Sequence, residues 1–188
     1  MIEYEELYKI VEEKLSAKRF NHSKYVVKRA LEYAEIYNVD KEIIKLCAIA
    51  HDIAKELTDE DVQYYIEKYD IEFDEIEKNN KNLWHSKIGA EICKNEFGFN
   101  DDMVNAVKFH TTGRANMSLL EKVICLADAT EETRKYCDVQ EYVDYIIKDI
   151  DYAMFKISKL VIEKLTSREE VIHLDTVKCY NYYIKNNL

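Results

Sequence analysis

Apolar residues recur at spacings of three and four along almost the whole chain, which is typical of amphipathic helices. The sequence contains no proline and three glycines, so it offers few of the signals that bound strands or form hairpins. It contains no linker, internal repeat or low-complexity tract. The pattern therefore predicts an all-α fold with one domain over residues 1–188, whose core covers about 18–135 and carries C-terminal helices over 138–187.

The helices can be placed coarsely from the same pattern. We predict them over residues 1–17, 21–37, 40–57, 58–69, 85–97, 101–111, 118–136 and 138–164, with a last one after His173. The polar run that follows Tyr69 is expected to be irregular as far as Asn82. Helix 40–57 is apolar on nearly every side, which is typical of a central, buried helix. Helix 138–164 carries an apolar stripe that includes Ile157 and Val161, as expected for packing on a core.

Composition and charge exclude several classes of function. A net charge of -10 argues against nucleic acid as the main partner, since that binding depends on Lys and Arg. No run approaches the roughly 20 uncharged apolar residues that a membrane helix needs. The five cysteines form no Cys-x-x-Cys pair, so neither a disulfide framework nor a thiolate zinc site is indicated. We expect a cytoplasmic protein without a membrane partner, whose ligand is a small anionic molecule if metals supply positive charge.

The pair His51-Asp52 is the first candidate for chemistry, because it falls within the most apolar predicted helix. An ionised carboxylate is costly there unless it is paired or bound to a metal. Lys55 follows at a spacing that places it on the same side of the helix, where it could meet a phosphate beside the metals. A buried His-Asp pair with a purely structural role explains the dipeptide equally well when it is taken alone.

Four further residues change that balance, because His22, His85, His110 and Asp128 are also of metal-ligating types. His22 lies on the helix that precedes the His51 helix, and helices adjacent in sequence usually pack together. Asp128 ends an apolar helical face. Four imidazoles and two carboxylates can hold two transition metals a few Å apart and leave positions open for water and phosphate. Each residue taken singly would suit a capping or surface role.

The segment after His110 has the groups expected around phosphoryl oxygens: the hydroxyls of Thr111 and Thr112, the turn allowed by Gly113, and the guanidinium of Arg114. Glu131 is a candidate for orienting a ligand from outside the metal's own coordination shell. His173 is interpreted as structural.

These residues stand in motifs that resemble the HD-domain metal-dependent phosphohydrolases, and more narrowly the symmetrical diadenosine tetraphosphate hydrolases of the YqeK type. The motifs are Arg19-Phe-Asn-His22, His51-Asp-Ile-Ala-Lys55, Trp84-His85, His110-Thr-Thr-Gly-Arg114, Leu126-Ala-Asp128 and Ile172-His-Leu-Asp-Thr-Val177. The chain departs from the family where Glu131-Glu-Thr-Arg134 and His173-Leu174 lack the usual prolines. Those changes affect loop stiffness and no proposed ligand.

The resemblance implies an HD-type helical bundle with a dinuclear metal site between its helices. It implies a first metal on His22, His51, Asp52 and Asp128, and a second on His85 and His110, with Asp52 bridging. Iron is the implied metal, with manganese or another divalent ion as alternatives. The implied reaction uses metal-activated water to split the central phosphoanhydride of diadenosine tetraphosphate into two ADP, with Asp52, Lys55 and Arg114 as catalytic residues. Arg19 is expected to help bind the leaving ADP. ADP or GDP is the expected product-like ligand.

Three other functions are compatible with the sequence. The chain could be an HD phosphohydrolase for a nucleoside monophosphate, an alarmone or a cyclic dinucleotide. It could be a non-catalytic nucleotide sensor, or a helical scaffold whose fifteen tyrosines serve a partner surface. The sequence does not separate adenine from guanine, nor does it give the oligomeric state, with which a homodimer is compatible.

Overall fold

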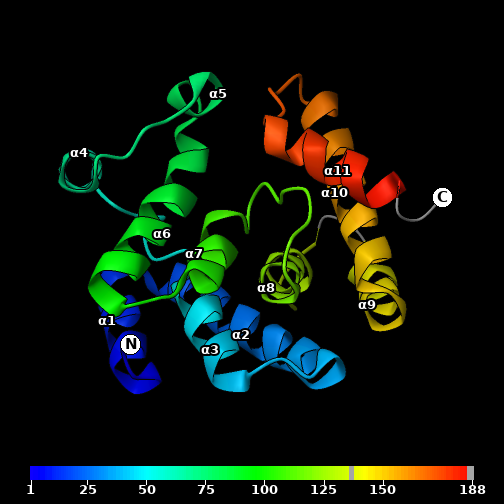
Figure 1. The fold of residues 1–188 in the computed structure, drawn as a ribbon, viewed down its shortest axis with the longest axis horizontal. Coiled ribbons are helices and arrows are strands. Elements are labelled where there is room, and N and C mark those ends of the chain that lie inside the picture. Colours follow the sequence, from blue (N-terminus) through cyan, green and yellow to red (C-terminus); the bar gives the residue numbers. More distant parts are fainter. Residues whose placement is uncertain (136–137, 186–188) are drawn as a thin grey trace.

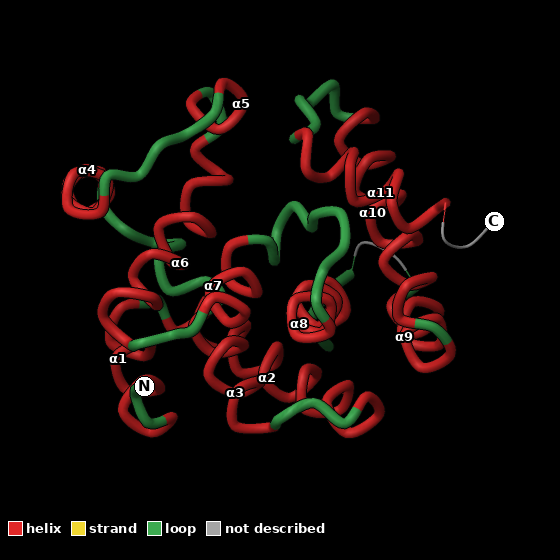
Figure 2. Tube along the Cα trace, viewed as in Figure 1, coloured by secondary structure: helices red, strands yellow, loops and turns green. Residues whose placement is uncertain are grey.

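The computed structural model describes residues 1–135 and 138–185, and these are helices and loops without a strand (Figure 2). The helices in chain order are α1 (Tyr4–Lys14), α2 (Ala17–Tyr37), α3 (Lys41–Ala50), α4 (Asp59–Tyr69), α5 (Glu75–Lys78), the 3-10 turn η1 (Lys81–Leu83), α6 (Trp84–Phe97), α7 (Asp101–Lys108), α8 (Leu119–Thr130), α9 (Val139–Lys148), α10 (Ile150–Ser167) and α11 (Leu174–Lys185). The predicted all-α class is confirmed.

Helix α8 stands at the centre of the arrangement (Figure 1). It packs on α2 and α7 on one side and on α10 on the other, and α9 and α11 pack on α10. The buried apolar side chains of these helices form one continuous core, in which α3 contributes a run from Leu46 to Ala50. Among the described residues, no helix is long and apolar enough to cross a membrane.

Most predicted helices are confirmed, together with their end signals. Asp40 caps α3 by accepting hydrogen bonds from two backbone N–H groups, and Thr58 opens α4 in a capping box. Asn38 and Gly98 end α2 and α6 in the left-handed conformation, with φ of 52° and 70°. Helix α2 starts earlier than predicted because the Ser16 side chain accepts a hydrogen bond from the Arg19 N–H.

Other parts of the predicted helix pattern were wrong. The predicted helix 40–57 ends at Ala50, and residues 51–56 form turns. The predicted helix 118–136 ends at Thr130, whereas residue 136 lies outside the described part of the chain. The predicted helix 138–164 is two helices, because Asp149 adopts extended backbone and its carboxylate caps α10. The run up to Asn82 contains α5 and the start of η1.

The last helix braces the loop between α7 and α8. Thr176 donates a hydrogen bond to the carbonyl of Thr112 over 3.0 Å, and the hydroxyl of Tyr183 accepts one from the N–H of Met117 over 3.0 Å. Gly113 lies against Cys179 with φ of +63°, so close that an added Cβ would come within 2.8 Å of the sulfur. The loop predicted to meet phosphate is therefore held from outside by α11.

We expect Gly113→Ala to destabilise the protein by about 2 kcal/mol, because a residue with a Cβ pays about 1–2 kcal/mol in the left-handed region and also meets the Cys179 sulfur. Chemical denaturation measures the loss. In the double variant Gly113→Ala/Cys179→Ala, the part of the stability loss caused by contact with the sulfur should disappear. The part caused by the left-handed φ should remain. If Cys179→Ala gives no relief in this double-mutant cycle, the close contact is not the cause.

Candidate metal centre

Six side chains meet where α2, α3, α6, α7 and α8 approach one another. His22 lies within α2, His51 and Asp52 directly follow α3, and His85 is in the first turn of α6. His110 lies two residues beyond α7, and Asp128 is in the last turn of α8. The structure therefore brings together all of the residues predicted as ligands: His22, His51, Asp52, His85, His110 and Asp128. Their binding of metal stays a prediction.

Each of the four imidazoles presents its Nε2 atom to the centre, because its Nδ1 atom is already engaged. In His51, His85 and His110, Nδ1 donates to the carbonyl three residues earlier, over 2.7, 2.8 and 2.6 Å. In His22, Nδ1 lies 3.2 Å from Oε1 of Glu131. Since a carbonyl or carboxylate oxygen can only accept, Nδ1 carries the proton. Each Nε2 is thereby available as a metal ligand.

Asp52 faces two separate pairs of histidines with its two oxygens. Oδ1 lies 3.2 Å from Nε2 of His85 and 3.6 Å from Nε2 of His110. Oδ2 lies 3.5 Å from Nε2 of His51 and 3.7 Å from Nε2 of His22. A carboxylate divided in this way is suited to bridge two cations, as a dinuclear site requires.

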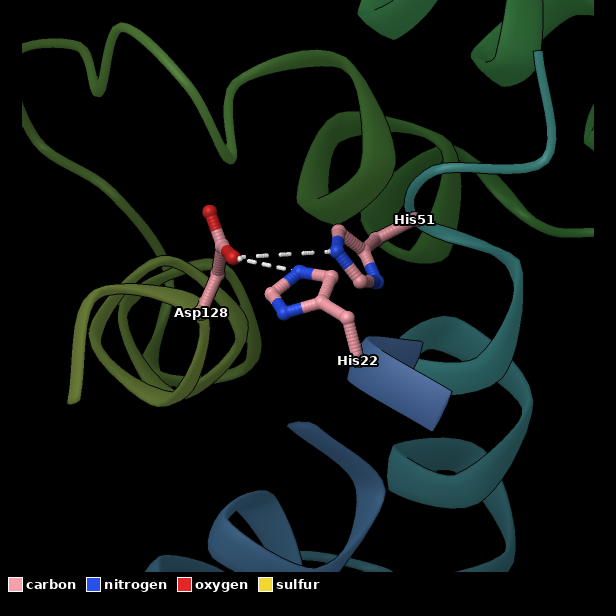
Figure 3. Close-up of side chains that lie close together, drawn as sticks. All are labelled: His22, His51 and Asp128. Atoms are coloured by element: carbon pink, nitrogen blue, oxygen red, sulfur yellow. Dashed lines mark ion pairs between the residues drawn. The ribbon is translucent and has the colours of Figure 1, made fainter. Parts of the chain in front are cut away.

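The opposite wall of the centre is formed by Asp128, toward which His22 and His51 point (Figure 3). Its Oδ1 atom is 3.0 Å from Nε2 of His22 and 3.8 Å from Nε2 of His51. Both of these nitrogen atoms are buried and form no hydrogen bond within the described residues. The candidate ligand atoms of His22, His51 and Asp128 lie within 4.8 Å of one another. Buried nitrogen atoms without a hydrogen bond, so close to a carboxylate oxygen, fit the coordination of a divalent cation.

The electrostatics of the centre favour ionised carboxylates. Burial alone would raise the pKa of Asp52, but the neighbouring imidazoles of His51, His110 and His85 hold that pKa well below its ordinary value. Burial also acts against ionised Asp128, whose pKa is held low by the neighbouring His22 imidazole and the charge of Arg134. Burial lowers the pKa of His85 to about 4, which keeps its imidazole neutral at physiological pH. Anionic oxygens and neutral imidazole are the forms that bind metal.

Residues 19–133 match the HD domain family, and this span covers more than half of the chain and all of the residues gathered at the centre. The chain belongs to the HD-domain family. It is 32% identical to the symmetrical bis(5'-nucleosyl)-tetraphosphatase of Staphylococcus aureus, over 95% of this chain and 93% of that protein. It is 30% identical to the protein of the same name from Bacillus subtilis, over 97% of this chain and 98% of that protein. Membership of the HD-domain family implies divalent metal binding.

The fold likeness extends beyond the span matched by the HD domain. The structure of a Clostridium acetobutylicum protein, described as an HD superfamily hydrolase involved in NAD metabolism, superposes with a TM-score of 0.92. The two chains are 32% identical, and the likeness covers 99% of each. The helices α9–α11 therefore belong to the shared architecture, although they follow the HD-domain match at residue 133.

Three cationic side chains surround the HD-domain centre. Nη1 of Arg19 lies 2.9 Å from Oδ2 of Asp52, and Arg134 pairs with the Asp128 carboxylate. Nζ of Lys55 lies 3.2 Å from Nδ1 of His85, and burial lowers the pKa of this lysine. Arg19 and Lys55 were predicted from the sequence. Arg134 was noted only as part of a motif, and its position six residues after Asp128 was the available signal.

A cavity of about 920 Å³ opens beside His22. Its lining includes four basic residues, Lys18, Arg19, Arg134 and Lys135, and two acidic ones, Glu56 and Glu131. A volume of this size is at the upper end of the roughly 300–1,000 Å³ that small-molecule sites occupy. Although the whole chain is acidic, this cavity offers local positive charge to an anionic ligand.

The segment after His110 is arranged less uniformly than its sequence suggests. The Thr111 hydroxyl lies 3.0 Å from Nε2 of His110 and thus at the centre. The Thr112 hydroxyl donates to the carbonyl of Gly113 instead. The Arg114 guanidinium donates to both carboxylate oxygens of Glu121, over 2.7 and 2.5 Å. Substrate binding by Thr112, Gly113 and Arg114 stays a prediction, since their described contacts are within the loop and to α8 and α11.

A second group of ligand-type residues lies outside the centre, where His173 meets Asp74 and Glu77. Nδ1 of His173 accepts a hydrogen bond from the N–H of Asp175, so Nε2 carries the proton and donates it to Asp74 over 3.1 Å. A protonated Nε2 has no lone pair for a metal. This contact joins the start of α11 to α5, in agreement with the structural role predicted for His173.

Proposed function

We propose that this protein hydrolyses diadenosine tetraphosphate symmetrically, releasing two ADP, with two divalent metal ions held by the HD-domain centre. The observation that supports it most is the division of Asp52 between two pairs of histidines, which suits two cations. The similarity to symmetrical bis(5'-nucleosyl)-tetraphosphatases over nearly the full length supports the substrate. Iron, a homodimer and a cytoplasmic location stay predictions.

The first metal position would comprise His22, His51, Asp52 and Asp128, and the second His85, His110 and the other oxygen of Asp52. Bound divalent metals supply Lewis acidity for phosphoryl oxygens and lower the pKa of water that attacks phosphorus. Glu131 accepts from His22 Nδ1 and thereby orients this ligand, the role expected of an outer-shell carboxylate.

The cationic side chains would handle the charge of the polyphosphate. Arg19 and Arg134 stand between the centre and the large cavity, so that phosphates crossing this boundary meet both guanidinium groups. Lys55 stands on the opposite side, beside His85, where its ammonium group can stabilise charge that develops on the leaving ADP. The substrate is cleaved at the middle of its phosphate chain, so phosphates extend to both sides of the centre. Cationic side chains on both sides suit such a substrate.

Product analysis tests the proposal directly. Protein purified without added metal is subjected to elemental analysis, then incubated with diadenosine tetraphosphate, and the nucleotides are separated by chromatography. We expect two equivalents of ADP. Release of AMP and ATP would contradict symmetrical cleavage, and binding without any product would favour a sensor.

We expect Lys55→Met to lower kcat by about 100-fold, the usual effect of removing one electrostatic donor from a reacting centre. Metal content should be kept, because the Lys55 ammonium group donates no lone pair. Steady-state kinetics and elemental analysis measure the two quantities. The control is Lys87→Met, which removes another partly buried lysine, paired with Glu77 outside the centre. Loss of metal in the Lys55 variant would instead indicate a structural role.

A further inference from the structure

Between α8 and α10 lies a second cavity, of about 140 Å³, that adjoins the metal centre. His110, Thr111 and Asp128 form its inner end. Its walls are mainly apolar and come from both helices: Cys125 and Ala129 from α8, and Ile157, Leu160 and Val161 from α10. Lys164 of α10 also lines it. The stripe predicted on the long C-terminal helix as core packing therefore also lines a space beside the centre.

The dimensions and chemistry of this cavity suit a planar ring. It is smaller than the roughly 300–1,000 Å³ that a complete small-molecule ligand occupies, so it can take part of one. Apolar walls that face each other across two helices suit the two faces of a nucleobase. Arg134 lines both this cavity and the large basic one, so the two spaces adjoin at the Asp128 side of the centre.

A third cavity, beside Lys55 and His85, is less suited to stacking although Trp84 lines it. The Trp84 ring is stacked on Phe73, with centroids 5.0 Å apart and an interplanar angle of 17°. Lys81 lies over the same indole at 5.5 Å from the centroid. Phe73 and Lys81 thus already pack against the Trp84 ring, which leaves it less available for stacking with a nucleobase.

We infer that the cavity between α8 and α10 binds one nucleobase of the substrate. This inference rests on the proposed function. It assigns nucleobase binding to Ile157, Leu160 and Val161, which lie outside the span matched by the HD domain. The C-terminal helices would thereby supply a wall that the HD domain itself lacks.

The test compares a ligand that has a base with one that has none. Binding of ADP and of inorganic pyrophosphate to manganese-loaded protein is measured by calorimetry for Val161→Trp, which fills the cavity, and Leu160→Ala, which removes part of its wall. The matched control is Ile162→Trp, on the same helix and also partly exposed, but not part of this lining. We expect Val161→Trp to weaken ADP binding by about tenfold, and Leu160→Ala by less, with pyrophosphate binding unchanged.

Unchanged ADP affinity in both cavity variants would overturn the inference, as would an equal loss for ADP and pyrophosphate. If Val161→Trp does not fold, Leu160→Ala decides alone. If the wild-type protein releases no ADP from diadenosine tetraphosphate, the proposed reaction is refuted. If the Leu160→Ala variant nevertheless binds ADP more weakly than the wild type, the inferred nucleobase site still stands. Product analysis therefore tests the proposed reaction, and ADP binding by the variants tests the nucleobase site independently.

Discussion

Asp52→Asn is expected to abolish symmetrical cleavage, with kcat reduced by more than about 100-fold, above the range for groups that only support a metal ligand. The amide keeps the shape of the carboxylate but loses its charge, and its nitrogen cannot bind a cation. Since Asp52 faces both histidine pairs, bound metal should fall at both positions. ADP release and elemental analysis measure these losses.

The control for this variant is Asp144→Asn, which changes an exposed aspartate on α9 that accepts only from Gln140 among the described contacts. Circular dichroism should show the same helical content in both variants. An Asp52→Asn protein that cleaves at the wild-type rate would show that this carboxylate does not bridge metals.

His85→Ala is expected to lower the metal content from two ions per chain to one and to reduce kcat by more than about 100-fold. The reason is that Nε2 of His85 faces only the Oδ1 side of Asp52, together with His110. The position formed by His22, His51 and Asp128 keeps its own ligands. Metal is counted by elemental analysis after dialysis, and cleavage by chromatography.

His173→Ala is the matched control, because this histidine is buried and hydrogen-bonded but lies outside the centre. It should keep both metals and most of the activity, while losing some stability through the contact with Asp74. A His85→Ala protein with two metals and full activity would contradict the dinuclear site.

The identity of the six candidate ligands could be predicted from the sequence, because imidazoles and carboxylates in apolar helical settings need partners. Their orientation could not. The apolar pattern continues through Ile53 and Ala54, so it gives no sign that α3 ends at Ala50 and that Asp52 stands in a turn. Helical periodicity reports burial, and residues in a buried turn satisfy it as well as residues in a helix.

The loop after His110 shows a second limit. Its neighbouring threonines point to different surroundings, and the Arg114 side chain is taken up by Glu121, which also closes the capping box of α8 with Ser118. The residue types in this loop predicted phosphate binding. Which partners these side chains have in the structure depends instead on where α8 begins and on how α11 packs against the loop. Likewise, the pattern over 138–164 placed its stripe correctly but not the break at Asp149.

Three of the four imidazole rings at the centre are oriented by a main-chain carbonyl, contributed by Ala48, Asn82 and Val107. Every amino acid supplies that oxygen, so the orientation of these rings does not depend on which side chain occupies the three positions. At the exposed position of Asn82, substitution can alter the flank of the centre without turning His85, whereas Ala48 and Val107 are buried, and core packing restricts their side chains. New specificities can be selected around a ligand set that the backbone keeps in place.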